Sequence, residues 1–173
     1  MRPRALAGTL GAASGRRRQL AQVLLALTLI VLAYLLWPYL TLWRLDRALV
    51  RDDQAALGRL VDLDAIRDAI RRQLNKEAVG NIGPLSDAFI AWLEDGIRRD
   101  GTAALDRAVT REWVRERMLA HSPPGAGLGP ALARAAFDDP LNFSLRLGGA
   151  SQVPVTVRMA FTGLGWRVRV LYY

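Results

Sequence analysis

The sequence predicts an α+β fold: an N-terminal transmembrane helix, then several short helices packed on a C-terminal three-stranded antiparallel sheet. Three observations predict it. An uncharged apolar run occupies residues 20–37, apolar residues recur at helical spacing over 41–120, and the period changes to two over 143–172. The predicted domains are a basic cytoplasmic tail (1–19), a transmembrane signal-anchor helix (20–43) and a periplasmic α+β domain (44–173).

The predicted membrane segment runs from Leu20 to Trp37, and only Gln22 and Thr28 in it are clearly polar. As a helix it is roughly 27 Å long, close to the thickness of the hydrocarbon core of a bilayer. Aromatic residues, whose rings favour the headgroup layer, gather at its C-terminal end: Trp37, Tyr39 and Trp43. The sequence therefore predicts one crossing of a bacterial inner (plasma) membrane.

The flanking charges predict the orientation. Five arginines precede the span, and no acidic residue precedes Asp46. Because basic flanks stay inside, we expect the N-terminus in the cytoplasm and the C-terminal domain in a periplasmic or other extracytoplasmic compartment. A cleaved signal peptide fits less well, since the apolar core is long and ends in the bulky residues 34–37. A twin-arginine signal matches Arg16–Arg18 only loosely.

The charge balance disfavours nucleic acid as a partner. The chain has 24 basic residues, and removing the five in the tail leaves 19 against 16 acidic ones, a net charge of +3 from Arg44 onward. The basic excess therefore belongs largely to the tail beside the membrane segment. The chain also has no cysteine, which excludes thiol chemistry and cysteine zinc sites.

The helices of the domain are predicted from caps and apolar stripes. Pro38 predicts a kink or the end of the span. In the third helix, Arg67 is expected on the solvent side. The first helix is expected over residues 41–51, and the second is a short helix that Asp52 or Asp53 caps and that ends at Leu60. The third begins at Asp62 or Asp64. The fourth is expected near 85–99 and the fifth over 103–120, with a restart at Thr110.

The C-terminal part predicts a meander with one apolar face. Phe143–Leu147, Val155–Phe161 and Trp166–Tyr172 alternate apolar and polar residues, with Val168, Val170 and Tyr172 expected on the apolar face. The helices are the available cover for this face. The preceding segment 121–130, HSPPGAGLGP, predicts a flexible loop, because its glycines lack the spacing of a phosphate-binding loop.

The stretch 38–74 contains a Pro-Tyr near the membrane exit, a helix ending in acidic residues, and a Leu-Val-Asp before a helix with an Arg and a Gln-Leu. These residues are Pro38, Tyr39, Asp52, Asp53, Leu60, Val61, Asp62, Arg67, Gln73 and Leu74. Together with the strand from Gly165 and Trp166, this order of motifs resembles a bacterial family known as domain of unknown function 2939. The resemblance implies the architecture and no known activity.

Two candidate binding sites follow from the pattern. Period two places Arg146, Arg158, Arg167 and Arg169 on one sheet face, which would suit an anionic ligand, an acidic partner or phospholipid headgroups, or is simply a solvated face. The second candidate is a helix–sheet cup for a small apolar ligand or lipid, or else a packed core. Its predicted lining is Phe89, Trp92, Trp113 and Trp166.

No catalytic, cofactor or metal site is predicted. His121 is the single histidine and has no nucleophile or orienting acid nearby in the sequence. Asp62, Asp64 and Asp68 have the placement of helix caps and dipole partners.

The sequence therefore favours a non-enzymatic accessory or binding module, anchored at the cell envelope, with an envelope protein or lipid as its partner. The alternative is a ligand- or lipid-binding domain that uses the cup. A weaker alternative is an envelope hydrolase, which would need a nucleophile–base pair that the sequence does not supply.

Overall fold

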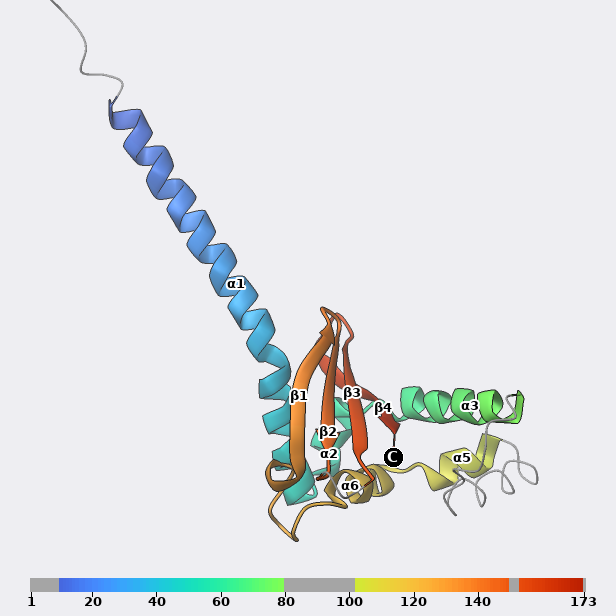
Figure 1. The fold of residues 1–173 in the computed structure, drawn as a ribbon. Helices are drawn as coiled ribbons and strands as arrows, with labels where there is room; N and C mark the ends of the chain where they lie inside the picture. The colour runs from blue at the N-terminus through green and yellow to red at the C-terminus, as the bar shows by residue number, and fades with distance from the viewer. Residues whose placement is uncertain (1–9, 80–101, 150–152, 173) are drawn as a thin grey trace, which may run out of the picture. The chain divides into compact units, whose positions relative to one another are not determined.

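The computed structural model describes residues 10–79, 102–149 and 153–172. The predicted α+β class is confirmed, with helices preceding a C-terminal antiparallel sheet (Figure 1). The contacts divide the chain into two units, Met1–Pro38 and Tyr39–Tyr173. The fourth predicted helix, 85–99, lies outside the described residues.

Helix α1, Leu10–Arg51, begins in the first unit and continues into the second. It runs through Pro38, so the expectation that this residue could end the helix is wrong. The proline removes only one hydrogen bond, to the carbonyl of Tyr34, and the bonds on either side still hold the helix.

The apolar part of α1 is exposed in the first unit. Most large apolar side chains from Leu20 to Trp37 are exposed, Leu24 and Ile30 among them. An 18-residue window of α1 has a mean hydropathy of 2.3, and none of that window is buried. Among the described residues, α1 is the one helix that is long and apolar enough to cross a membrane, by length and composition.

Three short side chains begin the next helices, as the caps in the sequence predict. The backbone N–H of Ala56 donates to Asp53 (2.9 Å) at the start of α2, Gln54–Leu60. Asp62 caps α3, Leu63–Val79, and Thr110 caps α6, Arg111–Leu119. Helix α5, Thr102–Ala108, precedes α6, so the predicted restart at Thr110 is confirmed.

The sheet has four strands, and the prediction of three is wrong. The strands are β1 (Leu132–Asp139), β2 (Asn142–Leu147), β3 (Val155–Phe161) and β4 (Trp166–Tyr172), paired antiparallel in that order. The missed strand, LARAAFDD, contains three alanines, lies at an edge and has two register irregularities, so it shows no clean alternation.

A register irregularity in β4 also changes which of its side chains are buried. Arg158 pairs with Val170 but Met159 pairs with Val168, which leaves Arg169 as the extra residue. Beyond this point Leu171 is buried and Tyr172 is exposed. The expectation that Val170 and Tyr172 share the apolar face is therefore wrong, because a bulge shifts the alternation by one residue.

The core lies between the apolar face of the sheet and the helices. The ring of Tyr39 in α1 packs edge-on against Phe143 at 4.9 Å between centroids. Val61, between α2 and α3, forms a parallel bridge with Val168 and so pairs with the edge of β4. Buried core residues include Leu45, Leu49, Leu57, Ile66, Leu105, Val114, Met118, Phe143, Leu145, Leu147, Val157, Met159, Trp166 and Val168.

Arginines from other elements bind the carbonyls at three helix ends. Arg67 of α3 donates to the carbonyls of Asp106 and Val109 at the end of α5, both at 3.0 Å. These are carbonyls that a helix leaves unpaired, and the helix dipole makes that end negative. The other two pairs are Arg115 with Leu49 at the end of α1 and Arg167 with Gly58 and Val61 at the end of α2.

Replacement of Arg67 should loosen the contact between α3 and α5. Its side chain is only 19% exposed, so the expectation that it faces solvent is wrong. We expect Arg67→Gln to lower the free energy of unfolding by about 1.5–3 kcal/mol, because charged hydrogen bonds to two carbonyls are lost. Denaturation of the full chain in detergent measures this. The exposed Arg146→Gln is the control, and equal stability of the two variants would contradict the assignment.

The glycine-rich loop is fixed to α1 at one point. The backbone N–H of Leu128 donates to Asp46 Oδ1, and Leu128 itself is buried. Gly127 has φ +70°, and a Cβ there would overlap Asp46 Oδ1. The segment is a loop, as predicted, but at Gly127 it is fixed in place rather than flexible, because both the left-handed backbone and the carboxylate require glycine.

Substitution of Gly127 should therefore be costly. We expect Gly127→Ala to lower the free energy of unfolding by about 2–4 kcal/mol, through left-handed strain and a displaced Asp46. Gly125→Ala is the matched control, since Gly125 also has positive φ but nothing within 4 Å. It should cost only the strain, about 1–2 kcal/mol. Equal losses in the two variants would show that the Asp46 contact contributes nothing.

Candidate functional site

Most of the arginine side chains predicted on one sheet face bind groups within the protein. Arg158 pairs with Asp138 at 3.3 Å, and Arg169 pairs with Asp62 at 3.5 Å. Arg167 donates to the backbone carbonyls at the end of α2, as described above. Arg146 is exposed and makes none of the ion pairs found in the described part of the chain.

Arg158 and Arg169 meet α3 around a polar cavity of about 270 Å³. Asp68 of α3 also lines it and pairs with Arg71 at 2.9 Å. Every arginine–carboxylate pair here reduces the attraction for an external anion. The full lining is Ala65, Asp68, Arg72, Asn142, Arg158, Ala160, Arg169 and Val170.

The residues predicted for the cup are only partly described. Trp166 is 2% exposed and packs against Phe137 and Phe161, both at 5.7 Å between ring centroids. Trp113 is buried on α6, and the guanidinium of Arg117 lies 5.8 Å from the centre of its ring. Phe89 and Trp92 lie outside the described residues. The cup stays a prediction.

The remaining sequence candidates have local structural partners. His121 Nε2 lies 2.9 Å from the carbonyl oxygen of Val153. Asp64 pairs with Arg67, and Asp62 caps α3. Within the described ranges, no group of three or more His, Asp and Glu side chains is placed to hold a metal ion.

In the part of the chain that the structure describes, two carboxylates have lowered pKa values, one at a turn and one at a helix start, both because of hydrogen bonds. The side-chain amide of Asn142 and the backbone N–H of Leu141 donate to Asp139 and lower the pKa of its carboxyl. The backbone N–H of Glu112 and the hydroxyl of Thr110 lower the pKa of Glu112 at the start of α6. A general acid at neutral pH needs the opposite shift, so these hydrogen bonds stabilise a turn and a helix start.

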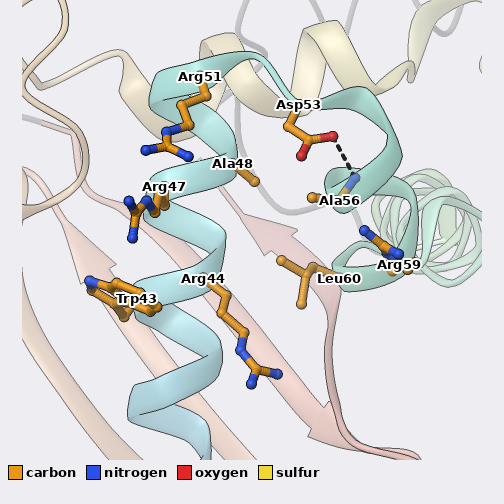
Figure 2. A pocket seen from close by; sticks show the side chains of 9 residues that line it. All are labelled: Trp43, Arg44, Arg47, Ala48, Arg51, Asp53, Ala56, Arg59 and Leu60. Carbon is orange, nitrogen blue, oxygen red and sulfur yellow. Dashed lines mark hydrogen bonds between the residues drawn. The ribbon is translucent and has the colours of Figure 1, made fainter.

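Sequence reasoning missed a second cavity, of about 500 Å³, between the end of α1 and α2 (Figure 2). We call it the arginine groove after Arg44, Arg47 and Arg51 of α1 and Arg59 of α2. Spacings of three and four residues place the first three on one stripe of the helix. Its other lining residues are Trp43, Ala48, Asp53, Ala56 and Leu60.

The groove carries more positive charge than its own residues neutralise. None of its four arginines makes an ion pair with a residue that the structure describes. Asp53 is the one acidic residue in the described lining of the groove, and Asp53 Oδ1 accepts the N–H of Ala56. Asp46, which follows Arg44 closely in sequence, binds Leu128 instead. Four cations against one anion, 4 − 1, leave the groove with a charge of +3.

The signal for half of this site was present in the sequence. The spacing of Arg44, Arg47 and Arg51 predicts a cationic helix stripe. Arg59 joins them only because Asp52, with φ 53°, reverses the chain between α1 and α2. Aspartate tolerates this left-handed conformation better than most residues, but its sequence position alone did not reveal the turn.

A comparison with known protein families identifies the family of this chain. The family described as "Protein of unknown function (DUF2939)" matches residues 27–117, which is more than half of the chain. The match covers the end of the apolar run, the arginine groove and the helices to α6. No curated protein and no solved structure matches the chain. The chain therefore belongs to the DUF2939 family of proteins of unknown function.

Proposed function

We propose that this protein is a single-pass, membrane-anchored binding module of the bacterial cell envelope, with no catalytic activity. The observation that supports the anchor is the exposed apolar surface of residues 20–37. Each large apolar side chain moved from water into a bilayer is stabilised by about 1.5–3 kcal/mol. The second unit, in contrast, has a buried apolar core between its sheet and helices.

The proposed orientation places the N-terminus in the cytoplasm and the domain in the periplasm. The positive-inside rule counts basic residues rather than net charge. Five arginines lie in residues 1–19, and four lie in residues 44–60. The excess on the N-terminal side supports this orientation.

A reporter fused after Tyr173 tests the orientation. Alkaline phosphatase at that position should be active, and green fluorescent protein should be dark, because the C-terminus is exported. The control joins the same reporters after Arg18, before the span, and should give the opposite pattern. Fluorescence with inactive phosphatase on the C-terminal fusion would overturn the proposed compartment.

The proposed non-enzymatic role is supported by how the polar side chains are used. His121, the single histidine, contacts a backbone carbonyl, and the acidic residues at the start of α3 cap that helix or pair with arginines. A binding role instead predicts partners within reach of an anchored domain, where tethering raises the effective concentration.

In-cell photocrosslinking tests the binding role. A photoreactive residue in place of exposed Trp43, which lines the groove, should give a discrete adduct with a membrane protein or lipid, and the same residue at exposed Arg134 should not. Identical adduct patterns from the two positions would contradict a specific binding surface at the groove.

A further inference from the structure

We propose that the arginine groove binds a phosphate group, and that in the cell this phosphate belongs to the headgroup of an anionic phospholipid. The inference rests on the membrane anchoring proposed above, and it names the ligand class of a site within that module.

The residues of the groove have the chemistry of a phosphate-binding site. Guanidinium groups present planar pairs of N–H donors that match phosphate oxygens, and they bind phosphate in a two-pronged geometry. Four arginine residues line a cavity of about 500 Å³, and Asp53 is the one carboxylate among its described lining residues. That volume lies within the range of small-molecule sites.

The arginines of the groove lack the carboxylate partners that several other arginines have within the described part of the chain. Elsewhere Arg158 and Arg169 have carboxylate partners, and Arg67 binds carbonyls. On α1, Arg47 and Arg51 are neighbours four residues apart, so their like charges repel each other. A bound anion would relieve this repulsion, which among the described lining residues only the carboxylate of Asp53 offsets.

Exposed apolar side chains beside the groove favour a lipid over a free anion. Leu40 lies one helical turn before Arg44 on the same stripe, and it is 55% exposed. Trp43 is also exposed, and the guanidinium of Arg47 lies 5.1 Å from the centre of its ring. Along α1, apolar side chains are therefore followed by cationic ones, which is the order of acyl chain and phosphate in a phospholipid.

The position of the groove in the sequence also favours a lipid as the ligand. Arg44 directly follows Trp43, where the predicted span ends. A chain that spans the membrane up to Trp43 leaves the hydrocarbon core at Arg44, among lipid headgroups, where the concentration of lipid phosphate is far higher than that of soluble phosphate. Basic residues at this depth are attracted to anionic lipids by about 1 kcal/mol each.

The experiment uses the full chain in uncharged detergent micelles and isothermal titration calorimetry. The three probes are short-chain phosphatidylglycerol, short-chain phosphatidylcholine and inorganic phosphate. We expect phosphatidylglycerol to bind at least about tenfold more tightly than either comparison probe, since only it combines a net negative phosphate with acyl chains.

Two double variants separate the groove from general positive charge. Arg47→Gln/Arg51→Gln should weaken binding of phosphatidylglycerol about tenfold or more, because two charged hydrogen-bonding groups are lost. Arg134→Gln/Arg146→Gln removes the same charge from the exposed β1–β2 pair and should leave affinity within about twofold. Unchanged near-ultraviolet circular dichroism shows that both variants stay folded.

Three results would overturn the inference. If both double variants bind phosphatidylglycerol equally weakly, the lipid is attracted by the overall positive charge of the protein and not by the groove. Inorganic phosphate that binds as tightly as phosphatidylglycerol would overturn the lipid as the source of the phosphate. If phosphatidylglycerol does not bind, the arginine groove is not a binding site for a phospholipid headgroup. Because binding in micelles does not depend on orientation, a cytoplasmic C-terminus would overturn the proposed compartment and leave this result unaffected.

Discussion

Trp166→Ala should lower the free energy of unfolding of the second unit by about 3–5 kcal/mol. Trp166 is 2% exposed, and its ring contacts Phe137, Phe143 and Phe161 edge-on or tilted. Truncation leaves a cavity at the centre of this aromatic cluster, which cannot close without moving β1 and β3. The loss is a large share of the stability of a typical domain.

The control for this prediction is a second tryptophan. Trp43 is 56% exposed, and its contact with Arg47 is a cation–π pair worth about 0.5–1 kcal/mol at an exposed site. Trp43→Ala should therefore cost no more than this. Both values come from chemical denaturation of the full chain in detergent, followed by near-ultraviolet circular dichroism. Equal stability of the two variants would show that the cluster around Trp166 is not the core.

Leu29→Arg/Ile30→Arg should abolish membrane anchoring. Both side chains are exposed in the apolar part of α1. Near the middle of a span, each change costs about 3–4 kcal/mol in insertion free energy, so the pair costs about 6–8 kcal/mol. If the same residues faced water, the arginines would instead be tolerated and would raise solubility.

The measurement is the share of the chain recovered with membranes after cell lysis. Wild type and the control Leu29→Ala/Ile30→Ala should sediment with the membranes, because alanine leaves the span uncharged. The arginine variant should move to the soluble fraction or be degraded. Retention of the arginine variant at the wild-type level would show that residues 20–37 do not anchor the chain through their apolar side chains.

Local chemistry made much of the fold predictable. Asp53, Asp62 and Thr110 begin helices because their short side chains accept the N–H groups that a helix start leaves unpaired. The strands β2 and β3 followed from alternation against a single apolar face. These signals act within a few residues, so one sequence is enough to show them.

What the sequence did not show depends on contacts between distant segments. Strand β1 owes its place to pairing with β2, since its alanines have little preference for a strand. The bulge at Arg169 shifts the alternation of β4, and Arg67 is turned inward by carbonyls of a helix 39 residues away.

The arginine groove needed tertiary structure for the same reason. The stripe of Arg44, Arg47 and Arg51 is a local feature of one helix. The groove is completed by Arg59 of α2, and it keeps its positive charge because Asp46 binds the N–H of Leu128. In the sequence, Asp46 counts as a partner that neutralises Arg44. In the folded protein, that carboxylate fixes a loop.

The central claim is that residues 20–37 lie within a bilayer. Membranes from cells that express the unmodified full chain can be washed with alkaline carbonate, which strips peripheral proteins, and then floated through a density gradient. We predict that the chain floats with the lipid. Its release into the carbonate wash would contradict the claim, since a chain bound only through its arginines would leave the membrane in that way.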